Sequence, residues 1–393
     1  MPWQGVSIVD RRMQFITEVW AETETVTDLA ARYGISRKTA YYWIQQYAQG
    51  GPGRLAGASH RPHRMPRLTS ANVVAQLVQA RQRHPTWGAG KLRAWLRRRA
   101  PDTAWPCRDT IHTHLVRAGA VRRRHRSVAR AVPSTLTIPR TPNQVWTIDF
   151  KGQFRTGEGV LCYPFTLRDG FSRFVLRCTA LPSIRTDDTQ AQCLRAFAEY
   201  GLPERLRSDN GAPFAGRGLA GLSRLAVWWL RLGIVPERIR PGCPGQNGSH
   251  EQFHRVLKRE TARPPAATRR AQQQRFARFV LEYNQDRPHA ALADQPPAGH
   301  YTPSSRPLPR RLPPVEYPRG YEVRRVCETG RIKWHDRRLF LTAALGGEDV
   351  GFDPLADGLW LVRFTTLPLA IFDERRWQLR RPDGETMLPI SSD

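Results

Sequence analysis

Apolar and polar positions alternate in different ways along the chain, and these differences divide it into four segments. In the first, residues 6–49, apolar side chains recur at helical spacing. The second, residues 68–121, repeats that helical spacing. The third, residues 141–300, opens with strand patterns and then alternates strands with helices, which predicts a mixed α/β sheet. The fourth, residues 321–372, follows a Pro-rich linker and consists of short alternating runs, which predict a small β-barrel.

The first segment predicts two short helices joined by a tight turn. Thr27 is the expected N-cap of the first helix, Gly34 supplies the turn, and Ser36 is the expected N-cap of the second helix. The positions expected to face inward are Ile35, Ala40 and Ile44. This order is typical of a helix-turn-helix, and an ordinary helical hairpin is the alternative. The side chains expected to face DNA are Arg37, Lys38, Thr39, Tyr41 and Tyr42.

The second segment predicts three helices and is rich in Lys and Arg. An apolar stripe runs from Val73 to Val78, a turn follows at Pro85–Gly88, and a third helix is expected at residues 109–118. Residues 51–140 hold 19 Lys and Arg against 2 Asp and Glu, which favours DNA contact over a merely solvated charge run. Cys107, His112 and His114 could suggest zinc, but a second pair of metal-binding residues is missing.

Charge and cysteine usage narrow the class of protein. The 393 residues carry 62 Lys and Arg against 34 Asp and Glu, a formal net charge of +28, which indicates a polyanionic partner. Nucleic acid fits better than a membrane surface, because no basic amphipathic helix stands beside an apolar anchor. No secretory signal or membrane-spanning run is apparent. The six cysteines form no Cys-x-x-Cys pair, so a reducing cytosol is expected.

The third and fourth segments predict a defined series of elements. The third begins with a strand at 145–150 and an antiparallel hairpin that turns at Arg168–Gly170. It continues as helix 187–200, strand 205–208, helix 218–232 and strand 235–239. The fourth is expected to form about five short strands, among them 321–324, 332–334, 339–341 and 359–362. Small barrels bind peptides as often as nucleic acids, so the pattern leaves the role of the fourth segment open.

Three carboxylates stand at positions that suit metal chemistry. Apolar neighbours at 146, 148 and 150 place Asp149 on the opposite face of its strand. Asp209 ends a second strand and opens an Asn-Gly turn at the edge of the sheet. Glu251 follows a Gly-rich loop and begins a polar helix, which can bring it to both aspartates. Taken singly, an Asp before Asn-Gly is usually a turn former, and a Glu at a helix start suits the helix dipole.

Three carboxylates arranged in this way would suit the cleavage of a phosphodiester bond. The reaction places further charge on an already anionic group, and two Mg²⁺ ions about 4 Å apart can activate the attacking oxygen and neutralise the leaving one. Magnesium prefers hard oxygen ligands and keeps several waters, so two or three carboxylates suffice to hold it.

Four motifs around these residues resemble the integrase catalytic core of bacterial insertion-sequence transposases of the DDE type, which are relatives of retroviral integrases. The motifs are Trp146–Phe150, Ser208–Phe214, Pro244–Glu251 and Tyr283–Leu292. The resemblance covers nearly the whole chain. It implies a multidomain α/β protein in which two helix-turn-helix domains (1–55 and 66–130) precede an RNase H-like core (141–300). A Pro-rich linker (301–318) and a small SH3-like β-barrel (319–375) would complete the chain.

The same resemblance implies a reaction and its participants. Asp149, Asp209 and Glu251 would be the catalytic residues and would hold two Mg²⁺ ions, for which Mn²⁺ may substitute. Hydrolysis would free 3′-hydroxyls at the element ends, which then attack target DNA by transesterification. Asn247, Arg255 and Lys258 are expected to touch DNA. His250 and His254, beside Glu251, are expected to contact DNA or solvent rather than a metal.

The expected partners are element-end inverted repeats, target DNA and further copies of this chain, with no membrane and a place in the cytoplasm at the bacterial nucleoid. Two alternatives stay open at this point. One is a non-catalytic DNA-binding regulator or decayed transposase, and the other is a metal-dependent nuclease without strand transfer.

Overall fold

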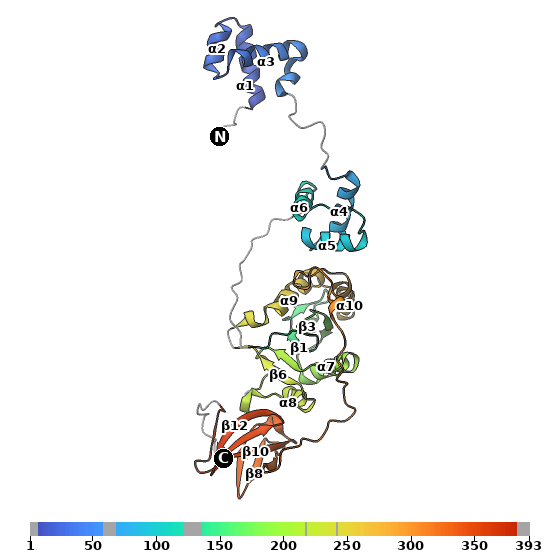
Figure 1. The fold of residues 1–393 in the computed structure, drawn as a ribbon, viewed down its shortest axis with the longest axis vertical. Helices are drawn as coiled ribbons and strands as arrows, with labels where there is room; N and C mark the ends of the chain where they lie inside the picture. The colour runs from blue at the N-terminus through green and yellow to red at the C-terminus, as the bar shows by residue number, and fades with distance from the viewer. Residues whose placement is uncertain (1–6, 58–67, 122–135, 217, 241–242, 383–393) are drawn as a thin grey trace. The chain divides into compact units, whose positions relative to one another are not determined.

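The fold was analysed in a computed structural model, which describes residues 7–57, 68–121, 136–216, 218–240 and 243–382 (Figure 1). Contacts along the chain divide it into two compact units, Met1–Ser70 and Ala71–Asp393. Parts of the two Arg-rich stretches around residues 58–67 and 122–135, and the start of the Gly-rich loop at 241–242, lie outside the described residues.

The first unit is a small helical domain built on one core. Its elements are α1 (Ile8–Trp20), α2 (Val26–Arg32), α3 (Arg37–Gly50) and a 3₁₀ turn (Gly51–Ala56). The expected helix pair is present as α2 and α3, and Ser36 caps α3 by accepting a hydrogen bond from the Thr39 amide at 3.2 Å. The N-cap of α2 is Thr25, however, so the expectation for Thr27 is wrong. The helix begins earlier because Val26 already packs against the core.

The inward positions of this helix pair agree with the sequence pattern. Ala40 is fully buried, and Ile35 and Ile44 are half-buried against the same core. The other buried members of that core are Phe15, Ile16, Leu29, Ala30 and Leu55. All of them come from residues 15–55, so this domain has a hydrophobic core of its own.

The second unit begins with three further helices. These are α4 (Ala71–Arg83), α5 (Ala89–Arg99) and α6 (Arg108–Arg117), as the second segment of the sequence predicts. Their shared core contains three tryptophans, Trp87, Trp95 and Trp105, together with Leu77 and Ile111. His84 stacks on Trp87 with ring centroids 3.9 Å apart.

A mixed six-stranded sheet follows. The strands are β1 (Val145–Phe150), β2 (Phe154–Arg155), β3 (Leu161–Asp169), β4 (Val175–Leu181), β5 (Arg205–Ser208) and β6 (Val235–Arg238). They lie in the order β2-β3-β1-β5-β6, with β4 also paired to β3. The first four strands pair antiparallel, whereas β1, β5 and β6 run parallel. The predicted mixed α/β sheet is therefore confirmed.

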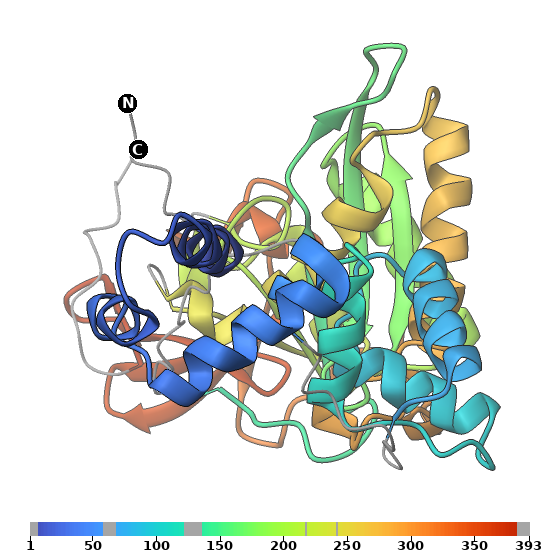
Figure 2. The same ribbon diagram turned by 90° about the horizontal axis from the view of Figure 1, so that it is seen from above.

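Helices cover both faces of this sheet. One face packs against α7 (Thr186–Tyr200) and α8 (Arg224–Arg231) through side chains that include Trp146, Phe165 and Phe197. The opposite face packs against α9 (Gly248–Thr261) and α10 (Arg269–Gln285). In Figure 2, α10 runs in orange beside the green strands of the sheet. Residues of β3 and β4 therefore contribute to two different cores, one on each face of the sheet.

One expected helix is divided. Residues 218–232 form a 3₁₀ turn at Leu219–Gly221 and a separate helix, α8. Gly221 takes a positive φ of 63°, which turns the chain, and the Ser223 hydroxyl then caps α8 by accepting from the Ala226 amide at 3.2 Å.

The C-terminal residues form two antiparallel sheets. The strands are β7 (Glu322–Arg325), β8 (Arg331–Trp334), β9 (Arg337–Phe340), β10 (Asp349–Ala356), β11 (Leu359–Phe364), β12 (Leu367–Asp373) and β13 (Gln378–Arg380). Five strands pair in the order β13-β12-β11-β10-β7, and β8 pairs with β9. Trp334 of the hairpin packs on Phe352 of the larger sheet, with ring centroids 4.6 Å apart. The expected strands are thus present, but closure into an SH3-like barrel is not confirmed by these pairings.

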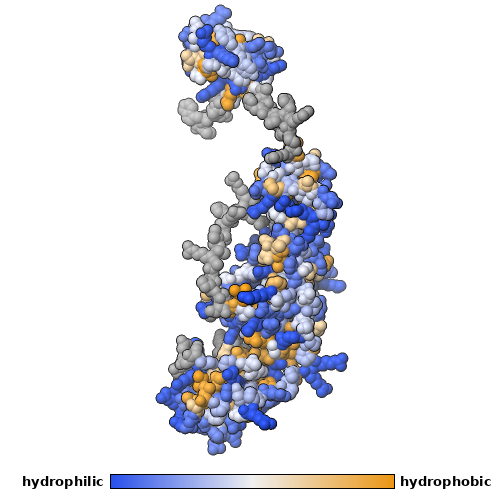
Figure 3. All heavy atoms as spheres, in the orientation of Figure 1, coloured by the Kyte–Doolittle hydropathy of each residue, from blue (hydrophilic) through white to orange (hydrophobic). Residues whose placement is uncertain are grey.

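Hydrophilic residues cover most of the face drawn in Figure 3, which agrees with the high formal charge. None of the described helices is long and apolar enough to cross a membrane.

Candidate active site

Asp149 lies on the central strand of the core sheet. Its strand β1 pairs with β3 on one side, where Asp149 is opposite Thr166, and with β5 on the other. Trp146 and Ile148 point into the core beneath α7 and α8. Asp149 lies on the opposite face, toward α9, as the alternation predicts. Its side chain keeps 18% of its surface exposed, so the carboxylate is accessible but largely desolvated.

Asp209 follows β5, the parallel neighbour of β1. The carboxyl ends of neighbouring parallel strands lie at one edge of the sheet, so Asp209 comes close to Asp149. One of its oxygens accepts from the Gly211 amide at 3.0 Å, which makes Asp209 a turn former as well. The Asn210 side chain donates to the Ile239 carbonyl at 2.7 Å and ties this turn to the end of β6.

Glu251 lies half-buried in the first turn of α9. Helix α9 packs on the sheet through Phe253 and Leu257, which fixes the side of the helix that Glu251 occupies. The Gly-rich loop before it forms a 3₁₀ turn at Pro244–Asn247.

Burial and the neighbouring acids act on the carboxyl group of Asp149. Burial is the largest cause of a rise in the pKa of Asp149 to about 7, and the negative charge of Asp209 is the second. Glu251 also raises this pKa, while the Phe150 amide and Lys151 oppose the rise. A bound cation would stabilise the charged form of a carboxyl that is half-protonated near neutral pH.

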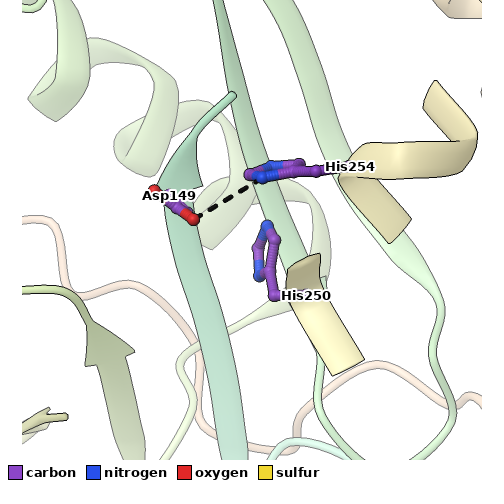
Figure 4. Close-up of side chains that lie close together, drawn as sticks. All are labelled: Asp149, His250 and His254. Atoms are coloured by element: carbon purple, nitrogen blue, oxygen red, sulfur yellow. Dashed lines mark ion pairs between the residues drawn. The ribbon is translucent and has the colours of Figure 1, made fainter. Parts of the chain in front are cut away.

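Two histidines of α9 lie beneath this site. His250 and His254 are 1% and 4% exposed, so the expectation that they contact DNA or solvent is wrong. His250 and His254 lie one turn apart on α9, on the same side as Phe253 and Leu257. This side of the helix faces the sheet, so both rings are buried against it. Figure 4 shows both rings beside Asp149, with His254 Nδ1 at 3.6 Å from Asp149 Oδ2.

Thr166 of β3 joins both rings to the strand that carries Asp149. Its hydroxyl donates to the Asp149 carbonyl oxygen at 3.0 Å, and it lies 2.7 Å from Nε2 of His250 and 2.7 Å from Nε2 of His254. A hydroxyl has one proton, so both Nε2 atoms must donate to it. The two Nδ1 atoms are then unprotonated, and that of His250 accepts from the Thr147 hydroxyl at 2.8 Å.

Electrostatics supports neutral rings. Burial, the His254 ring and Arg168 hold the pKa of His250 well below its usual range. Burial, followed by Lys151 and Arg168, lowers the pKa of His254 to about 3. Both rings therefore stay uncharged at neutral pH, and Nδ1 of His254 presents a lone pair to Asp149.

These donor groups fit a metal ion. Among the described residues, Asp149, His250 and His254 have ligand atoms within 4.8 Å of one another. Both nitrogens of His250 are already hydrogen-bonded to threonines, so His254 Nδ1 is the nitrogen best placed to serve an ion. Asp209 and Glu251 are not part of this group, although the charges of both act on Asp149. Their carboxylates are donors of the kind that Mg²⁺ and Mn²⁺ prefer.

The other predicted site residues lie in varied environments. Arg255 and Lys258 are exposed on α9, and Arg37, Lys38, Tyr41 and Tyr42 are exposed on α3, while Thr39 is half-buried. Asn247 departs from its expectation, because only 6% of it is exposed and it offers DNA little surface in this conformation. Cys107 is exposed and lies 3.1 Å from the Thr110 hydroxyl, and the described residues bring no metal-binding group together around it.

Sequence reasoning overlooked Lys151, Thr147 and Thr166. Thr147 and Lys151 lie two positions before and after Asp149, so their side chains share its face in an extended chain. This spacing could have identified both as neighbours of Asp149. Thr166 belongs to another strand and had no such signal.

Comparison with known proteins matches domain families to parts of this chain. Two models of the integrase core domain match residues 139–244 and 232–297. A helix-turn-helix domain model matches residues 11–63, and a homeodomain-like domain model matches residues 39–115.

Two curated relatives come from insertion elements. An uncharacterized 39.2 kDa protein of insertion element IS476 from Xanthomonas euvesicatoria is 29% identical over 258 residues, which cover 62% of this chain and 70% of the relative. An uncharacterized 31.7 kDa protein of insertion element IS407 from Burkholderia multivorans is 27% identical over 224 residues, covering 56% of this chain and 77% of the relative.

Solved structures with some similarity include two viral integrases. The catalytic core domain of HTLV-2 integrase in complex with magnesium has a TM-score of 0.32 and 14% identity, covering 41% of this chain and 99% of that one. A chain of the simian T-cell lymphotropic virus intasome in complex with PP2A regulatory subunit B56 gamma has a TM-score of 0.37 and 15% identity, covering 76% and 99%.

Helix-turn-helix domains ahead of an integrase core define a class of DNA-binding recombination proteins. Within that class, the integrase-core matches and the two insertion-element relatives support the resemblance of the motifs to insertion-sequence transposases of the DDE type. This similarity supports a role in DNA transposition in general.

Proposed function

We propose that this chain cleaves DNA at the ends of an insertion element and joins the freed 3′-hydroxyls to target DNA. The observation that carries the proposal is the placement of Asp149 on β1, beside the parallel strand β5 that leads into Asp209. Burial, followed by the charge of Asp209 and a smaller contribution from Glu251, raises the pKa of Asp149 to about 7, so a bound cation would offset the cost of its charged form.

Each residue then has a defined task. Asp149, Asp209 and Glu251 are the proposed catalytic residues and hold two Mg²⁺ ions, for which Mn²⁺ can substitute. When bound, the ions activate the attacking oxygen and neutralise the leaving one. The Thr166 hydroxyl holds the backbone of Asp149 in place from below, and Nδ1 of His254 lies beside the Asp149 carboxylate, where both could serve an ion. Lys258 and Arg255, exposed on the same helix as Glu251, are proposed to contact the DNA end through its phosphates.

The remaining parts of the chain are proposed to bring DNA to this site. Arg37, Lys38, Thr39, Tyr41 and Tyr42 on or beside the exposed face of α3 contact element ends, and joining two ends requires at least two copies of the chain on DNA. We propose the domain division 1–55, 66–130, 141–300 and 319–375, with an RNase H-like core, a linker at 301–318 and an SH3-like barrel last. The proposed place of action is the bacterial cytoplasm, at the nucleoid.

A strand-transfer assay tests the proposal. The full chain is incubated with Mg²⁺, labelled element-end DNA and a target plasmid, in parallel with Glu251→Gln and with Glu199→Gln as a control that removes an exposed acid from α7. Joined products are expected with the wild type and the control. Glu251→Gln should reduce joining by a factor of 100 or more, on the order expected when a ligand of a catalytic metal loses its charge.

The same assay separates the alternatives. Cleavage without joining would identify a nuclease, and binding without cleavage would identify a regulator or a decayed transposase. Joined products that persist in Glu251→Gln would remove Glu251 from the catalytic site.

A further inference from the structure

The motif at Tyr283–Leu292 has no part in the carboxylate site, yet it is held firmly at the end of α10. The Asn284 side chain accepts from the Val175 amide at 2.9 Å and donates to the Val175 carbonyl at 3.0 Å, which attaches the motif to β4. Arg287 is 3% exposed and donates to both carboxylate oxygens of Glu260 at 3.0 Å. These contacts position the residues that follow, including His289, over a cavity.

The cavity has a volume of about 480 Å³. Its walls come from the start of α5, the end of β3, helix α9 and the Tyr283–Leu292 motif. Five cationic side chains line it, whereas no Asp or Glu does; the cations are Lys91, Arg168, Arg173, Arg259 and Arg287.

Arg168 is the most informative of these cations. It is 2% exposed, and its guanidinium donates to the Ser249 carbonyl at 2.9 Å and packs 4.8 Å from the centre of the Phe253 ring. Its Nε is buried without a hydrogen-bond partner, and its hydrogen bonds go to the neutral carbonyl and hydroxyl of Ser249. Burial of a guanidinium that is bonded only to neutral groups is costly, so an anion from outside the chain would stabilise it.

The neighbouring groups reinforce the positive potential. The single carboxylate of Glu260 lies behind Arg287 and Arg259 and pairs with both. The hydrogen bonds of Lys91 and Arg173 go to neutral groups, namely the Pro288 carbonyl for Lys91 and the Ser249 hydroxyl for Arg173. Burial and then Arg287 lower the pKa of Lys91 to about 8. Burial lowers the pKa of His289 to about 2, with further contributions from Lys91, Arg287, Arg168 and Arg173.

We propose that this cavity binds a phosphate group. Guanidinium and ammonium donors that converge from several elements suit the oxygens of a phosphate, which accept from several directions at once. Gly88 begins α5 without a side-chain cap, so the free amides at that helix start add to the donors. The volume leaves room for the sugar and base of a nucleotide beside its phosphate, against a wall that includes the paired rings of Phe253 and Tyr283.

The phosphate could belong to a DNA strand or to a free phosphate compound. The DNA source rests on the proposed function, whereas the phosphate site itself does not. Binding of inorganic phosphate can therefore be measured without DNA or catalysis, and a failure of one proposal is distinguishable from a failure of the other.

The test uses the full chain and isothermal titration with inorganic phosphate at constant ionic strength. Arg173→Gln and Lys91→Gln should each weaken phosphate binding about tenfold, since each removes a charge-assisted hydrogen bond. Arg173→Lys should retain most of the affinity. The control is Arg270→Gln, which removes an equal charge from an exposed position on α10 outside this cavity and should bind as the wild type does. Circular dichroism verifies that each variant is folded.

A second arm identifies the source of the phosphate by measuring how DNA affinity falls with salt. If the cavity binds a DNA phosphate, the negative slope of log K against log salt should be less steep for Arg173→Gln than for the wild type, by about 1. Weakened phosphate binding with an unchanged slope would assign the cavity to a free phosphate compound. Phosphate affinities and salt slopes equal to those of the wild type in both Gln variants would overturn the proposal.

Discussion

Asp149 is a carboxyl whose burial makes the metal-free protein sensitive to pH. Its pKa in the folded chain is about 7, above the ordinary 3.8 of an unfolded aspartate, so the folded state binds the proton more tightly. The resulting stabilisation is fully present below pH 3.8 and is lost as the pH rises toward 7. At neutral pH without metal, a charged Asp149 therefore opposes folding.

Replacement of this carboxyl gives the first prediction. In EDTA at pH 8, Asp149→Asn should be more stable than the wild type by roughly 2–4 kcal/mol, since a neutral amide avoids the burial of charge. At pH 4 the two proteins should differ little. Urea denaturation at both pH values measures the difference. A variant that is less stable than the wild type at pH 8 would show that the charge of Asp149 is already compensated without metal.

Thr166 carries a second residue-scale prediction, because one hydroxyl serves three partners. Thr166→Val keeps the shape of the side chain but leaves Nε2 of His250, Nε2 of His254 and the Asp149 carbonyl without their partner. We expect a loss of about 3 kcal/mol or more in the free energy of unfolding, whereas Thr166→Ser should lose about 1 kcal/mol. Equal denaturation midpoints for Val and Ser would contradict this hydrogen-bond network.

At the scale of elements, Glu260 connects α9 to the helices that precede the core. Its carboxylate receives Arg287 from the end of α10 and the hydroxyl of Thr86 from the α4–α5 turn. Arg287 in turn lies over the Trp87 ring, 5.6 Å from its centre. His84 adds a contact of 2.9 Å with Glu282. The three-helix domain is thus attached to α9 and to the end of α10 through hydrogen bonds and a largely buried ion pair.

We expect Glu260→Gln to destabilise the second unit by about 3 kcal/mol, because it leaves Arg287 buried without its counter-charge. Glu199→Gln is the matched control, since its pair with Arg177 is half exposed and should contribute less than about 1 kcal/mol. Chemical denaturation measures both variants. Similar losses would mean that the pair at Glu260 is as well solvated as the one at the surface.

The elements also show what the sequence could and could not predict. The strand at 145–150 and its hairpin partner were predictable, because alternation fixes which face each residue occupies. The same alternation placed Asp149 correctly. The break before α8 was missed because a run of apolar residues outweighed Gly221 and Ser223. Burial of His250 and His254 was missed since it depends on Thr166, which approaches only when β3 pairs with β1.

At the scale of the whole molecule, the chain contains two units with separate cores. The core of the first unit uses side chains from residues 13–55 alone, and that of the α4–α6 domain uses residues 73–121. A polypeptide of residues 71–393 should therefore fold without the first unit. Its thermal unfolding, followed by circular dichroism, should retain the midpoint of the corresponding transition in the full chain, within about 2 °C.

Fragment 71–393 should bind DNA more weakly, because it lacks the exposed basic and aromatic side chains of α3. Gel-shift titration against the full chain measures this loss. A fragment that aggregates, or that melts well below the full chain, would show that the first unit stabilises the rest.

The attachment of the α4–α6 domain to α9 has a consequence for how such transposases can be rebuilt. Exchange of the first unit for another DNA-reading module involves no residue of the second core. Exchange of α4–α6 alone would remove the Thr86 hydroxyl from Glu260 and the Trp87 ring from Arg287, and would uncover one side of this buried ion pair. The three-helix domain and α9 should therefore be inherited, or engineered, together.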